Sequence, residues 1–183
     1  MNTPIYDDII THCKSGDRSA QRELYRLLSP KMFAICVRYM GDRTAAEDVL
    51  QDGFVTLFSK IETFSDKGSF EGWAKRIFIN TALMSLRKND ALKMSDSLDN
   101  ADWMTSDEPC PVQDIGYKEL LRQIASLPTC YRTIFNMYAI EGYSHNDIAE
   151  TLGISSVASR SRLNRARAML QERIKKIRDA RER

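Results

Sequence analysis

The polar side chains with the clearest chemical potential lie on one predicted helix near the end of the chain. Its outer faces carry Arg160, Ser161, Arg162, Asn164, Arg165 and Arg167. Arginine binds guanine edges or phosphates through paired hydrogen bonds, and serine or asparagine can do either job less strongly. Residues 154–183 contain ten Arg or Lys against three Asp or Glu, a local charge of +7. A solvated basic helix would explain that charge alone, so the preceding segment decides between the two interpretations.

A short predicted helix and a tight turn precede the basic helix. Ser144 suits an N-cap, and Asp147 places a negative charge in the first turn, where it favours the helix dipole. Gly153 suits the left-handed position that ends a helix, and Ser155 can cap the next one. Two capped helices joined in this way are typical of a helix-turn-helix, whose second helix enters the major groove of DNA. This context favours DNA binding for the basic helix.

The basic helix also needs an apolar side that holds it to the rest of its domain. Helical spacing predicts one buried seam formed by Leu163, Ala166, Leu170, Ile174 and Ile177.

A second basic strip is predicted on a helix over residues 70–88. The residues expected to face the core are Phe70, Trp73, Ala74, Ile77, Thr81 and Met84. The residues expected to share the opposite strip are Arg76, Asn80, Leu83 and Arg87, with Lys88 beside them. Beside aromatic residues and the polar loop 63–69, this strip suits unstacked nucleic acid. An ordinary solvated helix face explains the same pattern.

An acidic helix is predicted before that strip, over residues 45–63. Thr44 and Glu47 match a capping box. Its core face is expected to contain Leu50, Phe54, Leu57, Phe58 and Ile61. Asp48, Gln51, Asp52 and Val55 share another face, and residues 42–71 contain seven acids against three bases. This face is either an ordinary solvated helix side or a docking surface.

The remaining patterns are also helical, so we predict an all-α protein of two small helical domains. Helices are expected over residues 4–14 and 117–127, from Asp17 to Gly41 with a kink or an interruption near Leu28 caused by Pro30, and from a Thr129 cap to Gly142. Residues 94–114 contain six acids, no Lys or Arg and two prolines, which is typical of a linker. Trp103 within it suggests a point of docking. The predicted domains are therefore 1–93 and 115–183, with the acidic linker between them.

Composition argues against several other classes of protein. The four cysteines form no C-x-x-C pair and the two histidines are far apart, so we expect no metal site, no cofactor and reduced thiols. The residues include no paired nucleophile and base and no glycine-rich phosphate loop, so we expect no enzyme. The acidic, polar N-terminus does not resemble a signal peptide, and no apolar run is long enough to span a membrane. A cytoplasmic protein is expected.

Four motifs, taken in order, resemble those of bacterial alternative sigma factors of the small extracytoplasmic-function (ECF, group 4) class. They are A-E-D-V-L-Q-D-G-F at 46–54, F-x-G-W-x-x-R-I-x-x-N at 70–80, L-P-x-x-Y-R-x-I-F at 127–135, and E-G-Y-S-x-x-D-I-A-x-x-L-G-I-S at 141–155 followed by S-R-L-N-R-A-R at 161–167. The resemblance covers residues 5 to about 175. It implies sigma domains two and four only, with domain three replaced by the linker.

The resemblance also implies a role for each polar surface. Asp48, Gln51 and Asp52 match the patch that binds the clamp helices of the RNA polymerase β′ subunit. The loop 63–69, with the group Arg76, Asn80, Arg87 and Lys88, matches the part that captures a flipped base and reads the −10 element of promoter DNA. The group Arg160, Ser161, Arg162, Asn164, Arg165 and Arg167 matches the helix that reads the −35 element. Other implied partners are the polymerase β flap and an anti-sigma factor.

One segment departs from the family pattern. Relatives often carry Glu-Gly-Thr or Glu-Gly-Ser after the helix cap, whereas this chain has Ser156-Val157-Ala158. Loss of that glutamate changes a position at the helix N-terminus that can approach DNA, and Val157 and Ala158 lower the hydrogen-bonding capacity there. We therefore predict an altered −35 preference.

A free-standing helix-turn-helix regulator is the main alternative. Such a protein would need a dimer seam to match paired half-sites, and the patterns indicate no dedicated one, although Ile174 and Ile177 could contribute.

Overall fold

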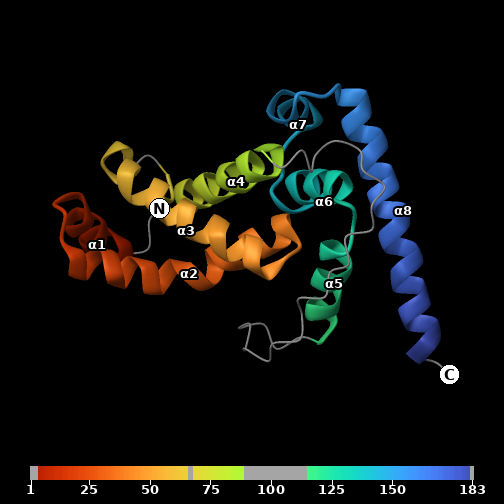
Figure 1. Cartoon of the computed structure of the whole chain (residues 1–183), viewed down its shortest axis with the longest axis horizontal. Helices are drawn as coiled ribbons and strands as arrows, with labels where there is room; N and C mark the ends of the chain where they lie inside the picture. The colour runs from red at the N-terminus through yellow and green to blue at the C-terminus, as the bar shows by residue number, and fades with distance from the viewer. Residues whose placement is uncertain (1–3, 66–67, 89–114, 182–183) are drawn as a thin grey trace. The chain divides into compact units, whose positions relative to one another are not determined.

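A computed structural model describes residues 4–65, 68–88 and 115–181 (Figure 1). These residues form eight α-helices, a 3₁₀ turn and a π-helical turn, and none of them lies in a strand. The prediction of an all-α fold is confirmed. The chain divides into two compact units, 1–88 and 89–183. The predicted linker 94–114, with Trp103, lies outside the described residues, so the domain limits stay predictions.

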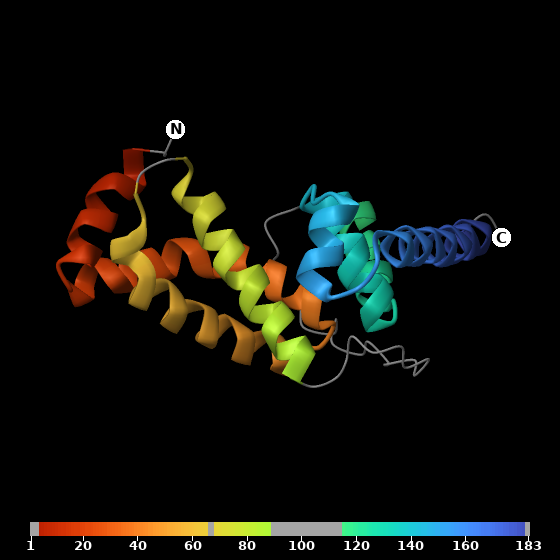
Figure 2. The same ribbon diagram turned by 90° about the horizontal axis from the view of Figure 1, so that it is seen from above.

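The first unit is a bundle in which three long helices pack against one another. It contains α1 (Pro4–Lys14), α2 (Arg18–Met40), α3 (Arg43–Lys60), the 3₁₀ turn η1 (Ile61–Thr63) and α4 (Phe70–Lys88). Helices α2, α3 and α4 contact each other pairwise, and α1 packs on α2 (Figure 2). Large side chains from all four helices fill the core, among them Tyr39, Leu57, Phe70 and Phe78. The predicted Asp17 cap and Gly41 stop are confirmed: Asp17 accepts from the Ser19 amide at 2.7 Å, and Gly41 has φ +70°.

Two local predictions for this unit are wrong. Pro30 does not interrupt α2, which runs through it as one helix from Arg18 to Met40. Leu28 and Met32 on either side are completely or almost completely buried. Their packing compensates for the one backbone hydrogen bond that proline removes.

The start of α3 is the second correction. Asp42, rather than Thr44, is the N-cap and accepts from the Ala45 amide at 2.7 Å. Glu47 instead accepts from Arg43 Nε at 2.9 Å, one turn earlier on the same helix. Asp and Thr are both good caps, and the preceding Gly41 stop leaves Asp42 in the extended conformation that a cap requires.

Gly53 on α3 permits a close contact between α3 and α4. A Cβ at this position would overlap the ring of Phe78 on α4, which is fully buried and has no room to move. We expect Gly53→Ala to destabilise the unit by about 1–3 kcal/mol, because overpacking a filled core displaces side chains or backbone. The free energy of unfolding from urea titration of the circular dichroism signal measures this effect.

Gly72→Ala on α4 is the matched control for that measurement. Its Cβ would meet Ser69 only at 3.7 Å, an ordinary contact, so we expect unchanged or slightly raised stability. Equal destabilisation by both substitutions would contradict the packing role of Gly53.

The second unit carries the helix-turn-helix. It contains α5 (Ile115–Ala125), α6 (Thr129–Phe135), the π-helical turn η2 (Asn136–Ile140), α7 (His145–Leu152) and α8 (Ser156–Arg181). Its core includes Ile124, Leu127, Cys130, Tyr131, Ala166 and Leu170. Pro128 rather than Thr129 occupies the N-cap of α6, and Thr129 is itself helical and buried.

The predicted seam of α8 holds only over its first half. Leu163, Ala166 and Leu170 are buried, but Ile174 is 45% exposed and Ile177 is only half-buried. Arg173 on the same stretch still contacts α5, donating to the Gln123 carbonyl and to Ser126 Oγ. The sequence period continues into a part of the helix where few other elements of the unit cover the apolar side.

Among the described residues, no helix is both long enough and apolar enough to cross a lipid bilayer.

Candidate nucleic-acid interface and docking surface

The helix-turn-helix forms with the caps that the sequence predicts. The Asp147 amide donates to Ser144 Oγ at 3.2 Å, and the Ser144 amide donates to Asp147 Oδ2 at 3.0 Å. The Ser144 hydroxyl also donates to Asp147 Oδ2 at 2.7 Å, and the hydrogen bonds from the hydroxyl and the amide of Ser144 lower the pKa of the Asp147 carboxyl. Gly153 has φ +66°, and the Ala158 amide donates to Ser155 Oγ at 3.0 Å. Both ends of the turn are thus fixed by local hydrogen bonds, which sets the direction of α8 relative to α7.

The first half of α8 presents its polar side chains to solvent. Five of the six predicted −35 residues are exposed and Arg162 is half-buried, while Leu163 and Ala166 are buried on the opposite side. The exposed ones are Arg160, Ser161, Asn164, Arg165 and Arg167. The structure therefore brings all six onto one helix next to a capped turn, as the geometry of major-groove insertion requires.

Two of these arginines have aromatic contacts that the sequence patterns did not reveal. Arg165 Nη1 lies 3.4 Å from the Tyr131 hydroxyl, to which it donates. The guanidinium carbon of Arg167 lies 5.7 Å from the centre of the Tyr138 ring, within the range of a cation–π interaction. The sequence places tyrosines on the preceding predicted helix, but helical periodicity does not specify which of their side chains would face the arginines of α8.

His145, the first residue of α7, also contacts Tyr138. The two rings stack with centroids 4.4 Å apart and planes 21° apart. Its Nδ1 lies 2.9 Å from Oγ of Ser159, a side chain buried on α8. Burial lowers the pKa of His145, and the positive charges of Arg160 and Arg167 lower it further. The ring is therefore neutral at neutral pH.

This lowered pKa predicts a pH-dependent stability of the second unit. Since the unfolded chain binds the proton more readily than the folded unit does, stability is complete above the unfolded pKa of about 6.5 and falls as the pH drops towards and through the folded value. We expect His145→Gln to remove this part of the acid destabilisation. The difference between the unfolding free energies of the two proteins, measured from pH 5 to 8 on one buffer series, tests it. A difference independent of pH would contradict the role of His145.

Arg132, in the Y-R pair of the third motif, supports the second unit from inside. It is 2% exposed, and its Nη1 donates to the carbonyls of Ala125 and Leu127 at 2.7 and 2.9 Å. Its Nη2 donates to Thr129 Oγ1 at 3.2 Å. These acceptors lie at the end of α5 and the start of α6, so Arg132 fixes the angle between two helices on which α8 packs.

On α4, the predicted basic strip is exposed at four of its positions, Arg76, Asn80, Arg87 and Lys88. The assignments of Leu83 and Met84 are reversed: Leu83 is 3% exposed and Met84 is 68% exposed. Helix α4 packs against both α2 and α3, so its buried arc is broad and takes in Leu83 at the edge of the strip. Met84 consequently lies in solvent between Asn80 and Arg87.

An aromatic cluster anchors the start of α4. The rings of Phe64 and Trp73 lie 5.4 Å apart, and those of Phe70 and Trp73 lie 5.6 Å apart. Phe64 is buried, and its carbonyl accepts from Lys14 Nζ at 2.9 Å. The loop predicted as polar therefore begins on a residue of the core, and Trp73 is half-buried in the cluster.

The acidic face of α3 is open. Asp48, Gln51, Asp52 and Val55 are all exposed, Val55 by 71%. Asp48 and Asp52 form no ion pair among the residues that the structure describes. Asp48 and Asp52 lie one helical turn apart, and Val55 lies about one turn further along the same face. Two unpaired carboxylates beside an exposed valine suit a basic partner that also makes apolar contacts.

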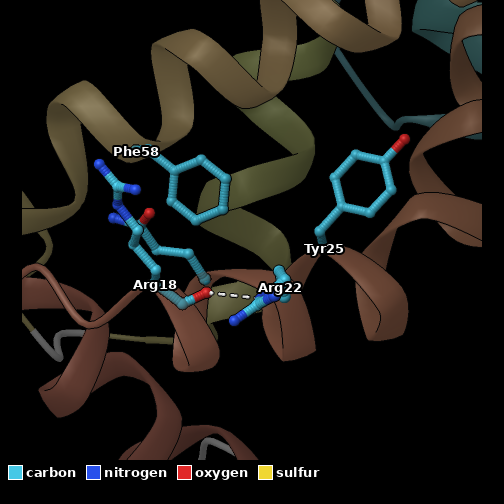
Figure 3. A pocket seen from close by; sticks show the side chains of 5 residues that line it. Arg18, Arg22, Tyr25 and Phe58 are labelled. Atoms are coloured by element: carbon cyan, nitrogen blue, oxygen red, sulfur yellow. Dashed lines mark hydrogen bonds between the residues drawn. The ribbon is translucent and has the colours of Figure 1, made fainter.

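A hollow between α2 and α3 adjoins this face. Figure 3 shows Arg18, Arg22 and Tyr25 on α2 opposite Phe58 on α3, with Gln21 completing the lining. Arg22 Nε donates to the Arg18 carbonyl at 3.3 Å. Tyr25 is 43% exposed and its ring packs on Phe54 at 4.4 Å. Since Gln51, Val55 and Phe58 follow helical spacing, the hollow continues one edge of the acidic face.

The described residues show no group of three or more His, Cys, Asp or Glu side chains that could hold a metal ion. Cys13, Cys36 and Cys130 are buried free thiols. Burial raises the pKa of the Cys36 thiol to about 12. Burial and the nearby negative charge of Asp17 raise the pKa of the Cys13 thiol to about 11. Both side chains therefore stay in the unreactive thiol form.

Comparison with known proteins identifies two family models that match this chain. The sigma-70 region 2 family matches residues 24–92, and the sigma-70 region 4 family matches residues 117–170. The chain is 29% identical to the ECF RNA polymerase sigma factor SigE of Mycolicibacterium smegmatis over 88% of its own length, but it spans only 65% of that relative. It is 26% identical to SigW of Bacillus subtilis, covering 92% of this chain and 96% of that protein.

The fold agrees with these matches. The sigma factor RpoE of Bartonella quintana, solved in complex with the anti-sigma factor NepR, superimposes with a TM-score of 0.54 at 21% identity, covering 84% of this chain and 96% of that one. The two regions occur in the order of the two units, and curated relatives of the same kind match both together. The chain belongs to the sigma-70 family of RNA polymerase sigma factors.

Proposed function

We propose that this chain is an ECF (group 4) sigma factor, which binds core RNA polymerase and directs transcription initiation from specific promoters. The observation that carries this proposal is the division of surfaces between the two units. The first unit exposes an unpaired acidic face on α3 and a basic strip on α4, and the second exposes a capped helix-turn-helix with an arginine-rich α8. One DNA-binding surface would suffice for a simple regulator.

Each surface has a proposed role. Asp48, Gln51 and Asp52 bind the clamp helices of the polymerase β′ subunit, and the hollow at Tyr25 and Phe58 extends that contact. The second unit contacts the β flap while α8 reads the −35 element. An anti-sigma factor is the expected regulator, and the cytoplasm is the expected compartment. The domains would be residues 1–93 and 115–183, joined by the acidic linker. No chemistry is assigned to the chain itself.

The strip on α4 is proposed to hold the −10 element as a single strand. Arg76, Asn80, Arg87 and Lys88 supply charge and hydrogen bonds along the backbone and base edges. A flipped base costs a few kcal/mol of stacking, which a pocket must return through new stacking and base-edge hydrogen bonds. Trapping one strand in this way melts the duplex without ATP.

Promoter-directed run-off transcription tests the proposal. Purified core polymerase is mixed with the chain on a library of promoters, and the products are sequenced. We expect transcripts from a restricted set of promoters only when both components are present. The control is a chain with Arg160, Arg165 and Arg167 changed to alanine, which should still bind core but lose the set. Specific DNA binding without any transcript would instead favour a free-standing regulator, for which the exposed Ile174 offers an apolar contact.

Salt dependence separates phosphate from base contacts on α8. We expect Arg165→Ala to weaken binding of the −35 duplex. If Arg165 holds a phosphate, the slope of log affinity against log salt falls by about one. Fluorescence anisotropy at four salt concentrations measures that slope. Unchanged slope and unchanged sequence preference together would remove Arg165 from the DNA-facing group.

A further inference from the structure

We infer that Tyr138 and His145 are positioning residues for promoter binding, which hold Arg167 and the first half of α8 in the orientation that −35 recognition requires. This inference rests on the proposed function. It concerns residues outside the group to which the sequence assigns DNA contact, and it follows from one closed set of contacts in the second unit.

The contacts form a ring through three elements. Ser159 on α8 touches His145 on α7 at 2.9 Å, and His145 stacks on Tyr138 of η2 at 4.4 Å. Tyr138 in turn lies 5.7 Å from the guanidinium of Arg167, back on α8. Ser159 and Arg167 are eight residues apart, so the ring spans roughly 12 Å along the helix axis. This is the part of α8 that carries the proposed DNA-binding side chains.

This set of contacts is buried at Ser159 and open to solvent at Arg167. Ser159 is completely buried, His145 and Tyr138 are half-buried, and Arg167 is exposed. Because the contacts begin in the core, they restrain the position of the exposed Arg167 side chain. A tyrosine face limits the rotamers of an arginine that would otherwise be free, so less conformational entropy is lost when the arginine binds DNA.

The backbone around Tyr138 is specialised as well. Tyr138 lies within the π-helical turn, where the Glu141 amide donates to the Asn136 carbonyl at 3.0 Å and the Tyr143 amide to the Met137 carbonyl at 2.9 Å. Turns of this type are rare in α-helices and are often found at functional sites. Here the turn carries the aromatic ring of Tyr138, which contacts both His145 and Arg167.

His145 suits this position chemically. A neutral imidazole stacks on tyrosine and bonds Ser159 without adding a third positive charge beside Arg160 and Arg167. Burial and those two arginines lower its pKa, so the neutral form is the one present at neutral pH.

A double-mutant cycle tests the inference. Tyr138→Leu, Arg167→Ala and their combination are assembled with core polymerase. Binding is measured on the duplex that the unmodified chain selects from a randomised library. We expect losses of affinity of about 5-fold for Tyr138→Leu and about 10-fold for Arg167→Ala, but no more than about 10-fold for the pair, because the tyrosine acts through the arginine. Losses that multiply to about 50-fold would overturn the inference.

Two controls separate positioning from folding. Tyr138→Phe keeps the ring and should bind DNA within about two-fold of the unmodified chain. An effect as large as that of leucine would also overturn the inference. In the free chain, NMR should show the ring-current shift of the Arg167 side-chain protons in the tyrosine and phenylalanine proteins and its loss in the leucine protein. A shift that persists in Tyr138→Leu would contradict the contact itself.

Core binding by the same proteins distinguishes this inference from the proposed function. The ring lies in the second unit, so all variants should bind core polymerase through the acidic face of α3. Failure of the unmodified chain to bind core would overturn the proposed function and the inference with it. Normal core binding with a multiplicative cycle would overturn the inference alone.

Discussion

The double variant Asp48→Lys/Asp52→Lys is expected to lose at least about 100-fold in affinity for core polymerase. The two carboxylates are exposed and have no ion-pair partner among the described residues, so they are available to a basic partner. Lysines at the same positions would place like charges against that partner, which costs several kcal/mol at a specific interface. Equilibrium binding of the labelled chain to purified core, at fixed salt, measures the loss.

A matched control is available on α1 of the same unit. Asp7 and Asp8 are exposed, and Asp7→Lys/Asp8→Lys changes the net charge by the same amount. We expect this control to bind core within a few-fold of the unmodified chain, with any difference reflecting long-range attraction. If both double variants bind as the unmodified chain does, the assignment of the acidic face is wrong. Equal, large losses would show that net charge rather than this face determines binding.

Arg132→Met is expected to destabilise the second unit by about 3–5 kcal/mol. Arg132 is buried, and its guanidinium satisfies the Ala125 and Leu127 carbonyls and the Thr129 hydroxyl. Methionine fills much of the volume but leaves these acceptors without their charged donor, at about 1–3 kcal/mol for each unsatisfied group. Small domains have a free energy of unfolding of only about 5–15 kcal/mol. A loss of this size therefore leaves the second unit partly unfolded near the temperature at which the organism grows.

Thermal unfolding followed by circular dichroism, together with −35 binding, measures this effect. We expect a lower melting temperature for the second unit and weaker −35 binding, with core binding through the first unit kept. Arg122→Met on α5 is the control, because that side chain is half-exposed and its carboxylate contact with Glu119 is 3.6 Å. Surface pairs of this kind contribute at most about 1 kcal/mol. A melting temperature unchanged by Arg132→Met would contradict the supporting role of Arg132.

The features that sequence predicted correctly depend on neighbouring residues alone. Ser144, Gly153 and Ser155 fix the helix-turn-helix through hydrogen bonds and a positive φ within a few residues of each other. The exposed positions of Asp48 and Asp52 follow from the helical period of one amphipathic helix. Local chemistry of this kind is visible in a sequence because no distant contact is needed to decide it.

Apart from the caps of α3 and α6, the features that sequence missed depend on what packs from elsewhere. Periodicity put Met84 in the core and Leu83 on the surface, because it did not show that α4 is covered by two helices at once. It carried the seam of α8 to Ile174 and Ile177, although Leu170 is the last of the seam residues that is buried. The sequence predicts a kink or an interruption at Pro30, and the interruption does not occur because tertiary packing outweighs the loss of one hydrogen bond.

The contacts around the candidate site were beyond any periodic pattern. The sequence shows His145 only as a histidine too distant from other ligands to bind metal, yet it stacks on Tyr138 and touches Ser159. Arg132 belongs to the motif at 127–135, which gives it no role, yet it holds two helices together from inside. Such contacts join residues 5 to 14 positions apart through turns whose angles the sequence does not specify.

The most direct measurement of the central claim is the binding of the purified chain to core RNA polymerase at low salt, with any inhibitor removed. We predict a stoichiometric complex that co-elutes in gel filtration, with submicromolar affinity typical of a specific assembly. The Asp7→Lys/Asp8→Lys control should form the same complex and Asp48→Lys/Asp52→Lys should not. A folded chain that never co-elutes with core, yet still binds duplex DNA, would contradict the account and leave a helical DNA-binding protein.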